Sequence, residues 1–172
     1  TDVRALICRQ FGDLEQLEIT EVEPPVPTDT QILINVETTA VNYADAIMVA
    51  GNYQTKPALP FSPGLETAET VAACGTAVSR FRPGDRVMAL LNYGGMAEQA
   101  VAEQADTWAI PVAMDFIDAG AFPIAYFSSD VALRWQGRLE AGETLLVLGA
   151  AGGVGLTAVE IGKAFGARVI AG

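Results

Sequence analysis

The chain has 172 residues, of which 51% are hydrophobic, and its formal net charge is −11. This length allows one large domain or one domain with part of another, and the apolar content is ample for a core. The acidic balance argues against a nucleic-acid partner, because no basic stripe is left to neutralise phosphates. No apolar run approaches the roughly 20 residues that a membrane span requires, so no membrane segment is expected.

Histidine is absent from the chain. A catalytic site of the Ser-His-Asp or Cys-His type is therefore excluded for these residues, as is a zinc site with histidine ligands. Cys8 and Cys74 are the only cysteines, and the N-terminus lacks the apolar core of a signal peptide. These features predict two reduced, buried thiols and a cytoplasmic protein.

The N-terminal part of the sequence reads as short strands separated by turn residues. Asn42 is predicted to cap a short helix through Met48, with Asp45 three residues on, and the proline-rich segment 51–64 is predicted to be a loop. The expected strands are Val3–Cys8, Leu17–Val22, Gln31–Val41, Glu66–Ala73, Asp85–Leu91, Met96–Val101 and Thr107–Ile110.

After Pro111 the apolar period becomes helical. Two helices are expected, over Asp115–Phe122 and Ile124–Trp135, with Pro123 as the break between them. We therefore predict a β-rich domain over residues 1–122 and the start of an α/β domain over residues 123–172.

The strongest local motif is the glycine-rich turn in LLVLGAAGGVG, which begins at Leu145. The apolar strand Leu145–Leu148, typical of a parallel sheet covered on both faces, leads into Ala150, Gly152 and Gly155 at G-x-G-x-x-G spacing. In a dinucleotide site, Gly152 lets the backbone approach a pyrophosphate and Gly155 lets the helix pack closely. The candidate cofactor-binding residues are Ala150, Ala151, Gly152, Gly153, Val154 and Gly155. The alternative is a glycine-rich joint without a ligand.

Motifs in the same order along the whole chain resemble one family. They are VNYAD (41–45), AGNYQ (50–54), LPFSPGLE (59–66), FRPGDRVMAL (81–90), GGMAEQAV (94–101) and GETLLVLGAAGGVG (142–155). The chain resembles the N-terminal half of a medium-chain dehydrogenase/reductase, in the quinone oxidoreductase (zeta-crystallin-like) branch. The resemblance implies a β-rich GroES-like domain followed by the first part of an α/β Rossmann domain, incomplete at the C-terminus.

The resemblance also implies the chemistry. Zinc-dependent members of the superfamily carry cysteine where this sequence has Asn42 and histidine where it has Leu65, so no zinc is expected. The implied cofactor is NADPH, with NADH not excluded, and the implied substrate is a small quinone or α,β-unsaturated carbonyl compound. The full-length protein is expected to be a homodimer, without a nucleic-acid or membrane partner. The 172-residue chain alone is expected to be inactive, because the resemblance places further Rossmann strands downstream.

Particular residues receive roles from the resemblance. It places the Asn42 amide and the Tyr53 phenol at the catalytic cleft as hydrogen-bond donors, with Asn42 also near the cofactor, and the Ser128 hydroxyl near the nicotinamide. Asn42 alone could be only a helix cap, Tyr53 a surface aromatic residue, and Ser128 and Ser129 helix-surface hydroxyls. Asp45 is interpreted as a capping or cleft-structuring carboxylate rather than an acid catalyst, and Tyr43 and Trp108 as packing residues. Two alternative functions remain open: an enoyl-thioester reductase of the same fold, and a non-catalytic NADPH-binding relative.

Overall fold

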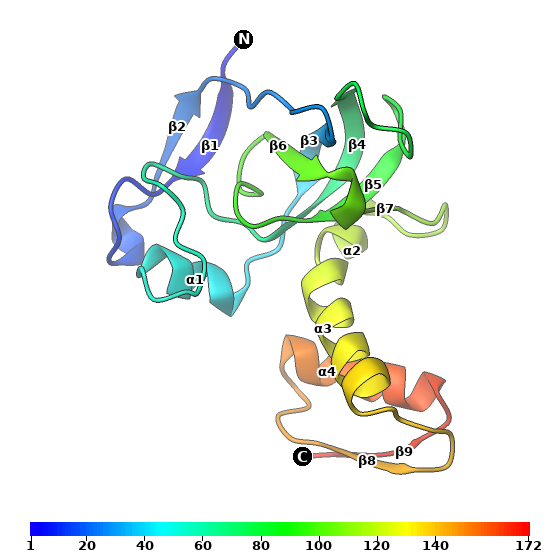
Figure 1. The fold of residues 1–172 in the computed structure, drawn as a ribbon. Coiled ribbons are helices and arrows are strands. Elements are labelled where there is room, and N and C mark those ends of the chain that lie inside the picture. Colours follow the sequence, from blue (N-terminus) through cyan, green and yellow to red (C-terminus); the bar gives the residue numbers. More distant parts are fainter. The chain divides into compact units, whose positions relative to one another are not determined.

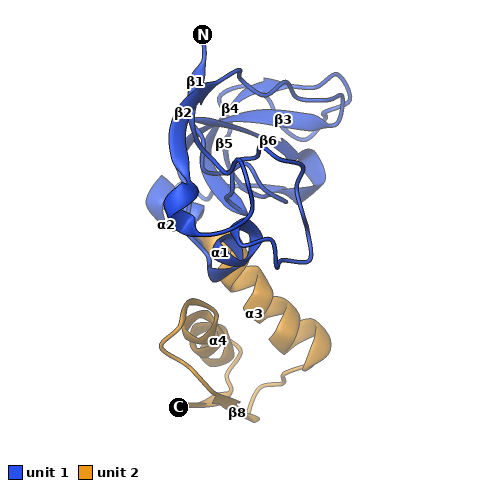
Figure 2. Ribbon diagram, turned by 90° about the vertical axis from the view of Figure 1, so that its left-hand side faces the viewer, with its two compact units in different colours: residues 1–121 blue, residues 122–172 orange.

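A computed structural model describes all 172 residues of the chain. The chain divides into two compact units, Thr1–Ala121 and Phe122–Gly172, coloured separately in Figure 2. The sequence places the boundary after residue 122. None of the helices combines the length and apolar character that a bilayer span requires.

The first unit is built mainly from antiparallel strands (Figure 1). A five-stranded sheet has the order β6-β3-β4-β5-β7, and a separate pair joins β1 to β2. The strands are β1 (Val3–Ile7), β2 (Glu18–Val22), β3 (Gln31–Thr38), β4 (Glu66–Cys74), β5 (Arg86–Leu90), β6 (Gln99–Glu103) and β7 (Thr107–Ala109).

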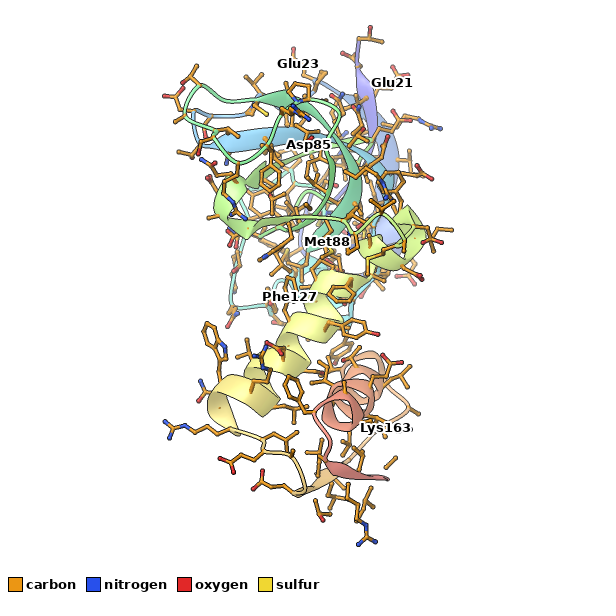
Figure 3. The ribbon with its side chains drawn as sticks, turned by 90° about the vertical axis from the view of Figure 1, so that its right-hand side faces the viewer. Glu21, Glu23, Asp85, Met88, Phe127 and Lys163 are labelled. Atoms are coloured by element: carbon orange, nitrogen blue, oxygen red, sulfur yellow. The ribbon has the colours of Figure 1, made fainter.

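The core of this unit follows from alternation along the strands. Adjacent residues of a strand point to opposite faces, so residues two apart share a face. Ile32 and Ile34 of β3 therefore both point into the core, where they are fully buried. They pack in one cluster with Val71, Val87, Ala89 and Ala102. Met88 is also buried, within this unit (Figure 3). Of the two free thiols, Cys8 is buried as predicted but Cys74 is partly exposed.

Strand β3 ends three residues earlier than the sequence predicts. Its pairing with β4 shifts register between Val36 and Thr38, and residues 39–42 leave the sheet and lead into helix α1 (Tyr43–Val49). The β-branched run that favours a strand is therefore interrupted by a local irregularity in pairing. This early end brings Asn42 to the start of α1.

Three short helical elements complete the first unit. Two 3₁₀ turns span Leu14–Gln16 and Gln104–Asp106. Helix α2 (Phe116–Gly120) begins at Asp115, whose carboxylate accepts a hydrogen bond from the Asp118 N–H at 2.8 Å. The helix predicted over residues 115–122 is thus shorter by its first residue and its last two.

The second unit starts with a long helical stretch over residues 123–136. The stretch contains α3 (Ser128–Asp130) between two π-helical segments, Pro123–Phe127 and Val131–Gln136. Pro123 is its first residue rather than only a break, because the missing N–H costs nothing in a first turn.

The rest of this unit is a β-α-β arrangement. Strand β8 (Thr144–Val147) and strand β9 (Arg168–Ala171) pair in parallel, and α4 (Gly153–Ala164) connects them. Lys163 lies in the last turn of α4 (Figure 3). Val147 is buried, whereas Leu146 and Ile170 on the opposite face are exposed. The expectation of a sheet covered on both faces is therefore wrong for this chain, which has a single helix on two strands.

Candidate functional site

The first group of candidate residues lies at the start of α1. Asn42 is the cap residue, with extended backbone, and its backbone N–H donates to Asp45 Oδ2 at 2.8 Å. Asp45 Oδ1 accepts a second hydrogen bond, from the Gly64 N–H at 3.0 Å. Asp45 therefore ties the first turn of α1 to the segment that precedes β4.

Asp45 is almost completely buried, with 3% of its surface exposed. Burial raises the pKa of its carboxyl above the ordinary value, while the hydrogen bonds from the Asn42 and Gly64 backbones act in the opposite direction. Both carboxylate oxygens are used by backbone donors. This geometry supports the interpretation of Asp45 as a capping residue rather than an acid catalyst.

The side chain of Asn42 makes a different contact. Its Nδ2 donates to Glu66 Oε1 at 2.8 Å, and Glu66 is 1% exposed. A carboxyl oxygen accepts here, so the nitrogen edge of the amide must face Glu66. Asn42 itself is half-buried, so its side chain is accessible in part.

The three aromatic residues singled out in this unit differ in how exposed they are. Tyr53 lies in the loop that follows α1, is partly exposed, and its hydroxyl makes no hydrogen bond to another residue. Tyr43 is 84% exposed, so its interpretation as a packing residue is wrong. It is the first residue of α1, and its side chain points away from the core that Met48 and Val49 enter. Trp108 is partly buried, in β7.

The second group is the turn between β8 and α4. Gly149 has φ of +72°, which glycine adopts without strain, and its carbonyl oxygen accepts from the Gly152 N–H at 3.1 Å. The first backbone bond of α4 runs from the Leu156 N–H to the Gly152 oxygen at 2.7 Å. The N–H groups of Gly153, Val154 and Gly155 precede that bond and point out of the helix end, where the helix dipole favours an anion.

The glycines of this turn differ in the space around them. A Cβ on Gly152 would meet only the Gly149 oxygen, at 3.6 Å, and a Cβ on Gly153 would meet nothing within 4 Å. A Cβ on Gly155 would lie 2.1 Å from the Gly149 oxygen. Gly155 is therefore needed for close packing of the chain, whereas Gly152 leaves open space beside free N–H groups. These features fit the pyrophosphate of a dinucleotide.

Comparisons with known proteins agree with this geometry. Residues 28–112 match the alcohol dehydrogenase GroES-like domain. The quinone oxidoreductase of Sus scrofa is 39% identical over 163 residues, which cover 94% of this chain and 50% of that protein. This chain is a member of the medium-chain dehydrogenase/reductase superfamily.

Solved structures of this superfamily share the fold along the whole chain. The human synaptic vesicle membrane protein VAT-1 homolog-like protein superposes with a TM-score of 0.93 at 32% identity, covering 99% of this chain and 55% of that one. The CurK enoyl reductase superposes with a TM-score of 0.90 at 25% identity, covering 99% and 54%. The chain spans about half the length of the curated relatives it matches. It corresponds to the GroES-like domain and the first part of the Rossmann domain of this reductase family.

The positions at which zinc-dependent family members bind metal carry other residues in this reductase-family chain. Asn42 is bonded to Glu66, and Leu65 is a buried apolar residue. The structure contains no group of three or more histidine, cysteine, aspartate or glutamate side chains arranged to hold a metal ion. The donor set therefore does not fit a catalytic zinc ion.

Two buried hydroxyl groups of the second unit, those of Ser129 and Thr157, contact each other. The sequence did not predict this contact. Ser129 Oγ lies 2.8 Å from both the Val154 carbonyl oxygen and Thr157 Oγ1, and Thr157 Oγ1 contacts the Ala125 oxygen at 3.0 Å. Both residues are buried, whereas the candidate Ser128 is exposed. Helical spacing alone cannot decide which of two adjacent serines points inward, and no local period relates Ser129 to Thr157.

Proposed function

We propose that the protein of which this chain forms the described part is a zinc-independent NAD(P)H-dependent oxidoreductase. The observation that carries the proposal is the open, glycine-lined end of α4, where free N–H groups lie beside Gly152 and Gly153. The family membership, and relatives named quinone oxidoreductase, support this class of reaction. The proposed substrate is a quinone or an α,β-unsaturated carbonyl compound.

The proposed roles of the chain follow from charge development. A bound nicotinamide cofactor supplies a hydride, and the acceptor gains negative charge on its oxygen before it takes a proton from solvent. One Nδ2 hydrogen of Asn42 is used in the hydrogen bond to Glu66. We assign the second to stabilising the negative charge on the oxygen of the hydride acceptor. The hydroxyl of Tyr53, which no residue engages, is the second proposed donor. Ser128, being exposed, remains a proposed contact of the nicotinamide.

A second candidate is an enoyl-thioester reductase. The fold similarity to the CurK enoyl reductase favours it, since both chemistries need hydride addition to a double bond conjugated with a carbonyl. A non-catalytic cofactor-binding protein is the third candidate. The preference for NADPH, the homodimer and the cytoplasmic location stay predictions.

Steady-state assays on the full-length protein test the proposal. We expect NADPH oxidation with 1,4-benzoquinone or but-3-en-2-one, and a loss of about 100-fold in kcat for Asn42→Ala, as for removal of one oxyanion donor. Asn52→Ala is the matched control, because Asn52 is exposed and lies outside the helix start. The 172-residue chain alone should show no turnover.

The outcomes separate the candidates. Turnover confined to enoyl thioesters favours the second candidate over quinone reduction. Cofactor binding without reduction of any quinone, enone or enoyl thioester contradicts the enzyme proposal and favours the third.

A further inference from the structure

We propose that Glu66 is a positioning residue that orients the Asn42 amide for the reaction. This inference rests on the proposed function. Glu66 is the first residue of β4, and Asn42 lies at the start of α1. Their side chains are hydrogen-bonded although the two residues are 24 positions apart in the chain. The bond therefore joins two elements that the sequence does not place together.

The backbone around Glu66 is held independently of that bond. The Thr39 hydroxyl donates to the Glu66 carbonyl oxygen at 2.6 Å, and the Glu66–Leu90 pair belongs to the β4–β5 register. Just before it, the Leu91 N–H donates to the Leu65 oxygen at 2.8 Å. The Glu66 side chain thus projects from a rigid support.

The backbone of Asn42 is also held independently, by Asp45. The two Asp45 carboxylate oxygens accept from the Asn42 and Gly64 N–H groups, which fixes the start of α1 against the segment before β4. The hydrogen bond between the two side chains acts directly on the orientation of the Asn42 amide.

The chemistry of the bond determines that orientation. An amide can rotate by half a turn and exchange its oxygen and nitrogen edges at little cost when both edges face water. The Glu66 carboxyl oxygen accepts a hydrogen bond from Nδ2 and would repel the amide oxygen, so one orientation is selected. Half-buried Asn42 then presents its remaining N–H in a fixed direction, as preorganised stabilisation of an oxyanion requires.

A buried carboxyl group costs free energy unless it is hydrogen-bonded. Glu66 is 1% exposed, and its Oε1 accepts the hydrogen bond from Asn42 Nδ2. A carboxyl group at this buried position, hydrogen-bonded to the half-buried Asn42 amide, fits a positioning role.

A double-mutant cycle in the full-length protein tests the inference. Glu66→Met keeps the volume and removes the acceptor, and we expect kcat for 1,4-benzoquinone to fall at least tenfold with KM for NADPH changed less than about twofold. In an Asn42→Ala background the same substitution should change kcat less than about twofold, because Glu66 acts through Asn42. Glu66→Gln retains an acceptor oxygen and should restore most of kcat.

An equal fall of kcat in both backgrounds would overturn the proposal and leave Glu66 a structural residue. A second measurement needs no variant: in the unmodified protein, one of the two Asn42 Nδ2 protons should be protected from solvent exchange by its hydrogen bond to Glu66. An amide pair that exchanges as in a free asparagine overturns the proposal even if Glu66→Met fails to fold. Absence of turnover in the unmodified protein contradicts the proposed function instead, while the NMR result still decides whether Glu66 orients Asn42.

Discussion

Gly155 and Gly149 approach so closely that a Cβ on Gly155 would lie 2.1 Å from the Gly149 carbonyl oxygen. Because the obstructing atoms are backbone, Gly155→Ala must displace the turn or the helix, at a cost of about 1–3 kcal/mol or more. We expect hydrogen exchange to accelerate in residues 144–171 and to stay unchanged in β3 and β4. Gly153→Ala is the matched control, since nothing lies within 4 Å of its Cβ position. Equal exchange in the two variants would contradict the prediction.

Gly152→Val should abolish dinucleotide binding without unfolding the second unit. Gly152 has φ of −80° and ψ of 164°, which valine adopts easily, and its only Cβ neighbour is an oxygen at 3.6 Å. The side chain would instead fill the proposed pyrophosphate space, so affinity should fall by at least about two orders of magnitude. Titration of cofactor fluorescence in the full-length protein measures the effect.

The control for that experiment is Ala164→Val, at the exposed C-terminal end of the same helix. Gly137, a linker position in the sequence, is not a suitable control, because a Cβ there would lie 2.9 Å from the Ala132 oxygen. If Gly152→Val and Ala164→Val bind cofactor equally well, the turn is only a structural joint.

Thr157→Val should destabilise the second unit. The change keeps the shape of the side chain but removes the hydroxyl that contacts Ser129 Oγ at 2.8 Å and the Ala125 oxygen at 3.0 Å. Loss of a partner for buried polar groups costs about 1–3 kcal/mol. Urea unfolding measures the free energy, and Thr157→Ser, which retains the hydroxyl, should recover most of it. A valine variant as stable as the unmodified chain would show that the hydroxyl pair has no net effect.

Asp45 should make the stability of the chain fall as pH rises through a specific window. Burial raises the pKa of Asp45 in the folded state, so the folded chain binds this proton more tightly than the unfolded chain. Stability from this group is therefore complete below its unfolded pKa, about 3.9, and is lost as pH rises through the raised folded pKa. The opposite dependence is expected from Glu98, because hydrogen bonds from the Arg4 backbone and side chain lower the pKa of its carboxyl.

Asp45→Asn isolates this contribution. The free energy of unfolding, measured between about pH 3.5 and 7, should fall less with rising pH in the variant than in the unmodified chain. The variant should also be less stable near neutral pH by about 1–3 kcal/mol, because one Asp45 oxygen that accepts a backbone N–H becomes a donor. Identical pH profiles would contradict the assignment of a raised pKa.

The purified protein should contain no stoichiometric zinc. Asn42 and Leu65 occupy the positions of two family zinc ligands, and neither an amide bonded to Glu66 nor a buried leucine replaces a thiolate or an imidazole. Elemental analysis after dialysis checks this prediction. One zinc ion per chain that survives a chelator would contradict it.

The sequence by itself determined the family, the β-rich and α/β organisation, and the position of the glycine turn. These features follow from local rules: alternation predicted the strand that carries the buried Ile32 and Ile34, and an apolar strand followed by spaced glycines located the start of α4 within a few residues. It also located Asn42 at the start of α1 and Asp45 as its capping partner.

Only the tertiary structure decided which side chains these positions contact. Glu66 is 24 residues from Asn42, and Ser129 is 28 residues from Thr157, so no local period relates either pair. The same holds for Tyr43, whose exposure depends on which face of α1 turns toward the core, and for β3, which ends where its pairing with β4 shifts register. Hydrogen bonds and packing between distant segments depend on how the chain closes on itself, and sequence patterns record only the periods of single elements.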